Sequence, residues 1–372
     1  MSSRDHVLVW DLPTRAFHWL LVLSFAAAWL AFDDDRYLYI HVYAGYVLLG
    51  LLIFRLLWGV IGSYHARFYT FAHDWPSVSA YLKGLLTGQA ARYLGHNPIG
   101  GWAIFFMLIL GLVVTLSGML TLGVEERHGP FAGLLSFDAS AVLREIHEIS
   151  AWTMLVMVVV HLGGVIVESF IHRENLIMAM ISGYKEGGES GVDVRPWSIV
   201  AVILLLLIFA SAFFTFRGYL SDTEQEPYLP FKGIVLSDNE LWREECGDCH
   251  MAYHPSLLPA RSWQAVMDGQ NDHFGDDLDL DEDVSAEISQ FLLTNSAEQL
   301  VIEPSWKILR STPDDETPLR ITEAIYWKDK HKDIAQRYWD SDKVGGKGDC
   351  GACHRDADAG TYEDAAMRLP RL

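Results

Sequence analysis

The sequence lacks the motifs on which many soluble enzymes depend. It contains no glycine-rich phosphate loop, no dinucleotide-binding motif and no arrangement typical of a catalytic nucleophile with its base. Phosphate and dinucleotide sites need glycines at fixed spacing, where the backbone approaches the phosphates, so nucleotide chemistry has no support here. Cysteine is also scarce, with four residues in 372. The chemistry of the chain must therefore be sought in these cysteines and in its histidines.

Charge is scarce in the first part of the chain and abundant in the rest. Residues 1–216 hold 16 acidic and 12 basic side chains, whereas residues 217–372 hold 32 acidic and 16 basic ones. The composition predicts a membrane half followed by a water-facing half. The acidic excess argues against a nucleic-acid partner and favours a protein partner with a basic docking face, although acidity that only keeps the tail soluble is an equal alternative.

Long apolar runs organise the membrane half. A helix needs about 20 residues to cross a bilayer, and five stretches are long enough: 16–32, 37–60, 101–122, 141–169 and 197–216. We expect an all-α protein, with a transmembrane helical bundle and an appended domain. The first stretch has no small-residue cleavage site and runs into a second span, so it predicts an uncleaved insertion signal.

Lysine and arginine predict the orientation of the bundle, because they accumulate in cytoplasmic loops. With the N-terminus inside, the cytoplasmic segments hold Arg4, Arg15, Arg55, Arg67, Lys83, Arg92, Arg173, Lys185 and Arg195. The opposite side holds Arg36, Arg127 and Arg144, together with Asp33, Asp34, Asp35, Glu125 and Glu126. We therefore expect a bacterial inner-membrane protein with a cytoplasmic N-terminus and, after an odd number of spans, a periplasmic tail.

The tail shows no strong strand alternation. Asp- and Gly-rich turns separate short helical stretches such as 262–268 and 285–294, which predicts a small, mostly helical, loop-rich domain. Its apolar content is low, so we expect covalently bound cofactors to form much of its core. The predicted domains are the bundle at 1–185, the fifth helix with its linker at 186–220, and the tail at 221–372.

All four cysteines belong to two copies of one motif. The copies read CGDCH and CGACH, and they supply Cys246, Cys249, His250, Cys350, Cys353 and His354. Two thiols spaced to meet the haem vinyl groups, followed by a histidine that reaches the iron, form the c-type haem attachment signature. A zinc site or disulfides would leave both histidines unexplained. The motifs predict two covalent haem c groups, which are attached outside the bacterial cytoplasm, in agreement with the topology.

Four histidines lie in or beside the apolar spans, where an ionisable side chain is costly and suggests a functional site. His147 and His161 are 14 residues apart on one predicted helix, so they share a face about 21 Å apart along the axis. His18 begins the first span on the inner side, and His41 begins the second on the outer side. Depth pairs His18 with His161 and His41 with His147, which predicts two bis-histidine haem b groups.

The first 185 residues resemble the bacterial di-haem cytochrome b proteins, which include the cytochrome b(561) group and the b-type subunits of nickel-iron hydrogenases. The matching segments are VWDLPTRAFHWLL, HVYAGYVLLGLLIFRLLWG, HARFYTF, GHNPIGGW and HRENLIMAMISGYK. The resemblance implies a four-helix bundle with two haem b groups and exchange with a membrane quinone. It also suggests that His96 and Asn97 bind the quinone. The alternative is that these residues only cap a helix.

The tail resembles the di-haem cytochrome c family through LPARSW, DHFG and the second haem motif with Gly360. Such proteins are similar to electron donors of a small oxygen-binding periplasmic haem protein, which is the partner that the resemblance implies. His254 departs from the family pattern, which has proline there, and reads as a chance surface residue.

Each haem motif supplies one axial ligand, and a second must come from elsewhere in the tail. His254 follows His250 by four residues, so on a helix it would lie on the same face of the haem. His273 lies 23 residues after His250, and His331 lies 23 before His354. We assign His273 to the first iron and His331 to the second, and exchange between the two haems stays open. Methionine is the rival ligand, from Met251, Met267 or Met367.

These features predict a quinol:cytochrome-type oxidoreductase that passes electrons between quinone in the lipid bilayer and a soluble periplasmic haem protein. The sequence does not determine the direction of electron flow, and it leaves a homo-oligomer open. Two rivals stay open: a superoxide:quinone oxidoreductase, and a membrane anchor for a hydrogenase or dehydrogenase. The first gives the haem c groups no role, and the second makes the tail redundant.

Overall fold

The structure is a computed structural model that describes residues 6–32, 37–126, 129–132, 134–135, 139–187, 198–220, 236–300, 302–363 and 366–372. Several charges used for the orientation lie outside these residues, namely Arg4, Asp33, Asp34, Asp35, Arg36, Arg127 and Arg195. The chain divides into two compact units, one formed by residues 1–121 and 141–218 and the other by 122–140 and 219–372. The domain limits expected from the sequence stay predictions.

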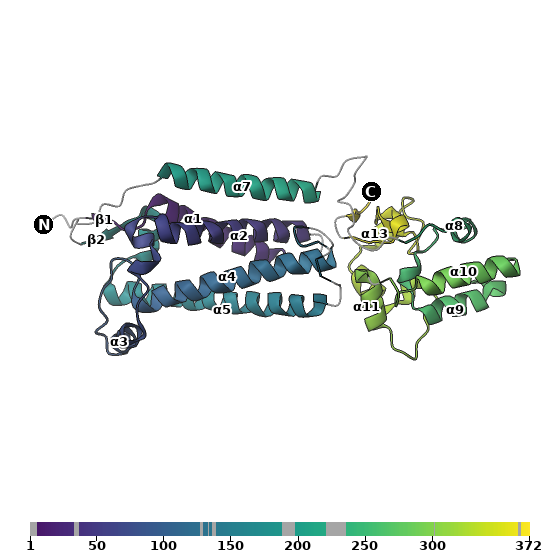
Figure 1. Ribbon diagram of the computed structural model, residues 1–372, viewed down its shortest axis with the longest axis horizontal. Helices are drawn as coiled ribbons and strands as arrows, with labels where there is room; N and C mark the ends of the chain where they lie inside the picture. The colour runs from purple at the N-terminus through teal and green to yellow at the C-terminus, as the bar shows by residue number, and fades with distance from the viewer. Residues whose placement is uncertain are drawn as a thin grey trace. The chain divides into compact units, whose positions relative to one another are not determined.

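The first unit is a bundle of long helices (Figure 1). They are α1 (Leu12–Leu30), α2 (Leu38–Ile61), α4 (Pro98–Glu125), α5 (Ser140–His172) and α7 (Ser198–Leu220). Of the described helices, α2, α4 and α5 are long and apolar enough to cross a membrane. Helices α1 and α7 also form where spans were expected, but they do not meet this criterion. Helix α1 contains Arg15 and His18, and the described apolar stretch of α7 is short, Leu205–Phe214.

Asp11 fixes the start of α1. Its Oδ1 accepts a hydrogen bond from the backbone N–H of Thr14 at 2.9 Å, which caps the helix. Its Oδ2 accepts another from the indole Nε1 of Trp58 at 3.1 Å. Asp11 is 2% exposed, so this buried carboxylate is well satisfied. It therefore joins the N-terminal end of α1 to the C-terminal end of α2.

The outer surface of the bundle is apolar. On α5, the side chains of Val156, Val159, Val160 and Leu162 are all exposed. A patch of this kind is unfavourable in water but suits lipid, where the helical backbone satisfies its own hydrogen bonds. Within the bundle, Phe17 of α1, Phe54 of α2 and Ala212 of α7 share one buried cluster.

Short elements lie at the end of the bundle where α1 begins. The antiparallel strands β1 (His6–Leu8) and β2 (Tyr184–Glu186) pair Val7 with Lys185. The amphipathic helix α3 (Trp75–Leu86) is capped by Asp74, and α6 (Leu176–Ser182) by Asn175. The 3-10 turns η2 (Tyr64–Ala66) and η3 (Phe68–Thr70) follow α2. None of these elements was expected from the sequence.

The second unit is mostly helical and rich in loops, as expected. Its α-helices are α8 (Glu240–Gly247), α9 (Ala260–Asp268), α10 (Glu282–Thr294), α11 (Glu303–Ser311), α12 (Ile325–His331) and α13 (Gln336–Trp339). Its 3-10 turns are η5 (Pro255–Leu257), η6 (Gln270–Asp272), η7 (Ile321–Glu323), η8 (Cys350–Ala352) and η9 (Ala357–Ala359). The helical stretches predicted at 262–268 and 285–294 are confirmed as parts of α9 and α10.

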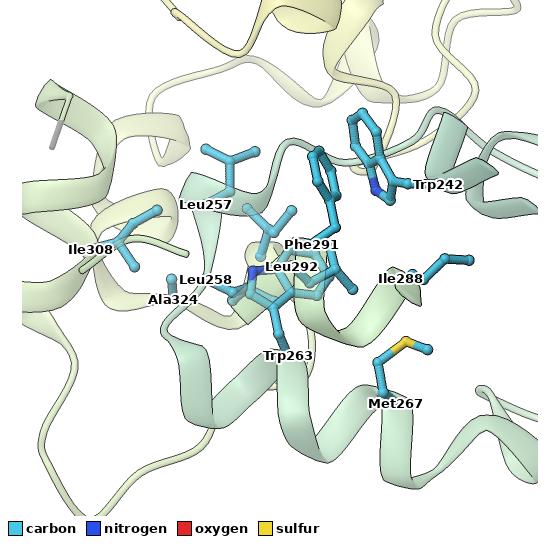
Figure 2. Packing of buried hydrophobic residues seen from close by; sticks show 11 residues of the cluster. Trp242, Leu257, Leu258, Trp263, Met267, Ile288, Phe291, Leu292, Ile308 and Ala324 are labelled. Atoms are coloured by element: carbon cyan, nitrogen blue, oxygen red, sulfur yellow. The ribbon is translucent and has the colours of Figure 1, made fainter. Parts of the chain in front are cut away.

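The tail has a hydrophobic core of its own. Trp242 and Phe291 lie with their ring centres 5.2 Å apart, and Leu258 and Ile288 are almost completely buried (Figure 2). Trp263 donates its indole N–H to the carbonyl oxygen of Pro255 at 2.6 Å, which satisfies its polar atom inside this core. Side chains thus contribute more of the core than the low apolar content of the tail suggested.

Candidate haem sites

The inner pair of membrane histidines comes from α1 and α5. The ring centres of His18 and His161 lie 6.5 Å apart, with 51° between the ring planes. His18 Nδ1 is buried and has no hydrogen-bond partner in the described part of the protein. A buried nitrogen of this kind is costly unless another group occupies the space beside it.

The outer pair comes from α2 and α5. The ring centres of His41 and His147 lie 5.9 Å apart. His41 Nδ1 is 2.9 Å from the carbonyl oxygen of Ala28, and His147 Nδ1 is 2.9 Å from that of Val114. A carbonyl at Nδ1 holds the proton there, which leaves Nε2 of each ring unprotonated and able to bind a metal.

Gly118 on α4 makes room for the outer pair. A Cβ at this position would lie 2.8 Å from Cε1 of the His147 ring, closer than van der Waals contact permits. The missing side chain lets α4 approach α5 and lets its Val114 carbonyl reach His147. The orientation of this imidazole therefore depends on a glycine of the neighbouring helix.

The first tail pair joins the first haem motif to the segment after α9. The rings of His250 and His273 have centres 6.3 Å apart and planes at 31°. His250 Nδ1 lies 2.7 Å from the carbonyl oxygen of Met251, an arrangement that again leaves Nε2 for a metal. Burial raises the pKa of the Cys246 thiol to about 11.

The second tail pair joins the second haem motif to α12. The ring centres of His331 and His354 are 6.2 Å apart. His331 stacks on Trp327, with ring centres 4.3 Å apart, and its Nδ1 is 2.8 Å from the Trp327 carbonyl oxygen. Burial lowers the pKa of His354 to about 4 and that of His331 also falls. Both rings are therefore neutral, the form that binds metals.

The four spacings suit a metal between two imidazoles. Metal–nitrogen bonds are about 2 Å long and each ring centre lies roughly 1 Å beyond its nitrogen, so the two centres should be roughly 6 Å apart. The observed spacings run from 5.9 to 6.5 Å. All four predicted pairs are brought together, and their donor sets fit axially ligated haem. In the described part of the chain no three or more His, Cys, Asp or Glu side chains gather as a metal site of their own.

His254 is not a surface residue, contrary to the expectation from the sequence. It is 5% exposed, and its Nδ1 lies 2.7 Å from Oγ of the fully buried Ser256. Residues 251–254 are not helical, so the helical argument against His254 as a ligand was also wrong. The ring packs against Gly360. Of the rival methionines, Met267 lies in the hydrophobic core.

His96 and Asn97 differ in how they could serve a quinone. Asn97 Oδ1 accepts from the backbone N–H of Gly100 at 2.7 Å, which is the helix-cap alternative, and its Nδ2 donates to Glu168 at 2.9 Å. His96 lies between Trp10 and Phe71, with ring centres 4.6 and 4.5 Å away. Its Nδ1 is buried without a partner in the described structure, so His96 retains a free polar atom.

Two groups of polar residues were missed by sequence reasoning. Tyr253 stacks on His250 at 4.8 Å and donates its hydroxyl to the carbonyl oxygen of Gly348, beside the second haem motif. Glu168 binds Tyr81 and Asn97 at the inner end of α5. A signal for Glu168 existed, because a carboxylate at the end of an apolar span suggests function. Tyr253 had no comparable signal.

The sixth ligands can be tested by spectroscopy. We expect a His273→Ala and His331→Ala double variant to lose low-spin character at both haem c groups, because each iron loses one axial nitrogen. The wild type should lack the methionine-to-iron charge-transfer band, and a His254→Ala control should stay low-spin. Visible and magnetic circular dichroism spectra of the oxidised proteins measure both properties. A charge-transfer band in the wild type, or a low-spin double variant, would contradict the assignment.

Comparisons with known proteins found relatives of both parts of the chain. Residues 9–183 match the family model of prokaryotic cytochrome b561, and residues 242–362 match that of dihaem cytochrome c. A probable Ni/Fe-hydrogenase B-type cytochrome subunit from Azotobacter chroococcum is 29% identical over 219 residues, which cover 50% of this chain and 90% of the relative. The corresponding protein from Bradyrhizobium diazoefficiens is 27% identical and is covered to 87%. The solved diheme cytochrome c from Rhodobacter sphaeroides is 37% identical, with a TM-score of 0.31, and covers 35% of this chain and 100% of its own.

These matches establish the class of the protein. It is a membrane protein of electron transport whose cofactors are haem b and haem c. Residues 9–183 belong to the prokaryotic cytochrome b561 family, and residues 242–362 belong to the dihaem cytochrome c family.

Proposed function

We propose that the protein carries electrons from quinol in the membrane to a soluble periplasmic haem protein. The observation that carries this proposal is the presence of four histidine pairs on one chain, two among membrane helices and two in the acidic tail. Haem supplies one-electron chemistry when bound, and the protein sets ligands, burial and position. We propose that the N-terminus lies in the cytoplasm and the tail in the periplasm, because lysine and arginine accumulate in the loops on the N-terminal side.

Helix α5 organises the membrane part of this function. It contributes His147 to the outer pair and His161 to the inner pair, with about 21 Å between them along the axis. This distance puts one pair in each leaflet. His96, with its unpartnered buried nitrogen, is the candidate for holding quinone at the inner side.

The tail supplies the docking surface for the soluble acceptor. Residues 217–372 hold twice as many acidic as basic side chains, 32 against 16. Such a surface attracts a partner with a basic face, and salt weakens the attraction. A small oxygen-binding periplasmic cytochrome is the partner class that the resemblance of the tail suggests.

A membrane anchor for a hydrogenase is the second candidate, because the curated relatives are named as hydrogenase cytochrome subunits. The alignment to the Azotobacter chroococcum relative covers 90% of that protein but 50% of this chain. An anchoring role alone leaves the tail without a use. The tail therefore favours a soluble acceptor over a hydrogenase partner.

Three electron donors distinguish the candidates. The full protein is reconstituted in vesicles and mixed in turn with a quinol, with superoxide, and with a nickel-iron hydrogenase under hydrogen, while the haem c absorbance is followed. We expect quinol to reduce the haem c groups fastest, because the proposed inner site receives it directly. A protein that quinol leaves oxidised, while superoxide or hydrogenase reduces it, would contradict the proposal.

A further inference from the structure

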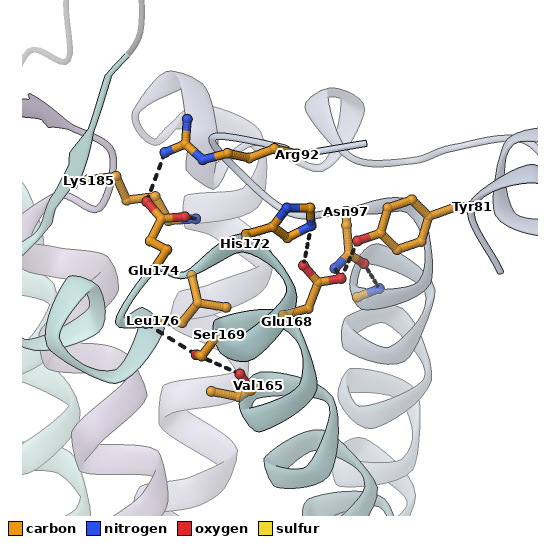
Figure 3. Close-up of polar contacts among 11 residues, drawn as sticks. Tyr81, Arg92, Asn97, Val165, Glu168, Ser169, His172, Glu174, Leu176 and Lys185 are labelled. Atoms are coloured by element: carbon orange, nitrogen blue, oxygen red, sulfur yellow. Dashed lines mark hydrogen bonds and ion pairs between the residues drawn. The ribbon is translucent and has the colours of Figure 1, made fainter. Parts of the chain in front are cut away.

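A polar cluster surrounds Glu168 at the inner end of α5 (Figure 3). Its members, called the Glu168 cluster below, are Tyr81, Asn97, Glu168 and His172. The carboxylate accepts hydrogen bonds from the Tyr81 hydroxyl and, at 2.9 Å, from Asn97 Nδ2. Its second oxygen lies 3.2 Å from His172 Nε2, close enough for an ion pair although not aligned for a hydrogen bond. Three elements, α3, the start of α4 and α5, thus converge on one carboxylate.

Glu168 occupies an unusual place for an acid. It follows His161 by seven residues, or about two helical turns, so the two side chains share a face of α5. Its side chain is 15% exposed and that of His172 is 12% exposed. A carboxylate held in such a place costs free energy, and ionisable groups kept at membrane depth commonly serve proton transfer.

Further side chains pack beside the Glu168 cluster. Tyr81 contacts Tyr93, with ring centres 5.6 Å apart, and Tyr93 contacts His73 at 5.7 Å. Lys185 of β2 is the nearby cation and interacts electrostatically with Glu168. On its other side the cluster includes Asn97, the chain neighbour of His96. Asn97 thus joins the carboxylate to the segment that carries the candidate quinone residue.

We propose that Glu168, with His172, accepts the protons that quinol releases at the inner side and passes them towards the cytoplasm. This inference rests on the proposed function. Oxidation of one quinol breaks two O–H bonds and gives quinone, two electrons and two protons. The two electrons would pass one at a time to the oxidised haem b that His18 and His161 would hold, and the protons go one after the other to the Glu168 carboxylate. His172 takes each proton from Glu168 and releases it at the surface.

The Glu168→Gln variant tests this role. Glutamine has nearly the same shape and still accepts from Tyr81 and Asn97 through its amide oxygen, but it cannot take a proton. We expect quinol to reduce the haem c groups of Glu168→Gln at least about tenfold more slowly than those of the wild type. Haem content, visible spectra, melting temperature and reduction by dithionite should stay unchanged.

A second readout follows the proton itself. When the wild type turns over quinol, the redox-difference infrared spectrum should gain the carbonyl band of a protonated carboxylic acid, and Glu168→Gln should lack it. Glu174→Gln is the matched control, because Glu174 is a nearby buried carboxylate that pairs with Arg92 at 2.9 Å and lies outside the cluster. It should keep both the band and the rate, whereas His172→Gln should keep the band and slow the reaction.

Failure of this inference differs from failure of the proposed function. If quinol does not reduce the wild type, the proposed function is wrong and the inference falls with it. If quinol reduces the wild type and Glu168→Gln at the same rate, or the infrared band persists in Glu168→Gln, the inference alone is wrong. Loss of haem b or a lower melting temperature in both Glu168→Gln and His172→Gln would mean that the cluster only stabilises the fold. That result would also overturn the inference.

Discussion

Extractable haem b should fall to about half of the wild-type amount in a His41→Ala variant, because an iron that loses one of two axial nitrogens is held weakly. His147→Ala should lose the same haem, since the two rings lie 5.9 Å apart. His18→Ala and His161→Ala should both lose the other haem. Pyridine haemochrome assay and redox titration of the remaining haem b measure the result. In His41→Ala and His147→Ala, reduction of haem c by quinol should nearly stop.

His73→Ala provides the control for these variants. His73 lies beside Tyr93 at the inner rim and belongs to none of the four pairs, so both haem b groups should remain. The remaining haem identifies each pair, because two variants of one pair should show the same midpoint potential. If His41→Ala and His18→Ala kept the same haem, the pairing by depth would be wrong.

Gly360→Ala should lower the free energy of unfolding of the tail by about 2–4 kcal/mol, from backbone strain together with steric overlap. Gly360 has φ 71°, a left-handed conformation that alanine adopts only at a cost. A Cβ there would also overlap the imidazole of His254, which is 5% exposed and held by Ser256. Relief of the overlap would have to move His254, which follows the first haem motif, or Gly360, which follows the second. Thermal unfolding of the full protein, followed at the haem c absorbance, measures the loss.

A double variant separates the two causes. In Gly360→Ala with His254→Ala the overlap disappears and the backbone strain remains, so part of the lost stability should return. Gly351→Ala is the control, because a methyl group there meets no atom closer than 3.9 Å, and surface changes of this kind cost about 0.5 kcal/mol or less. Wild-type stability in Gly360→Ala, or no recovery in the double variant, would contradict this account.

The sequence was most informative where one strong physical constraint acts. Helices α2, α4 and α5 appear at the positions expected from their apolar runs, because a bilayer leaves few alternatives to a helix of about 20 residues. Helix α3 was missed, since it is short and amphipathic and interrupts a loop between two spans. The β1–β2 pair was missed because it joins residues near 7 and 185, and no local sequence pattern predicts a contact over that separation.

The candidate site divides in a similar way. The cysteine motifs and the histidine depths are local or follow from helix geometry, and these features predicted the four pairs that the structure brings together. The surroundings of His254 and Glu168 depend on side chains from distant segments, and these contacts could not be predicted from the sequence. His254 shows the difference most clearly, because its burial comes from Gly360, a residue that lies in another haem motif segment.

Helix α7 keeps both redox units on one polypeptide, with 15 residues between its last residue, Leu220, and Leu236. Two separate proteins would have to meet by diffusion, and their rate of encounter would fall with their concentration. A covalent connection replaces that concentration by a local one that abundance does not change. Transfer between the two units would thus be a first-order process that does not depend on how much of the protein the cell makes. The encounter that does depend on abundance would be the one with the proposed soluble acceptor.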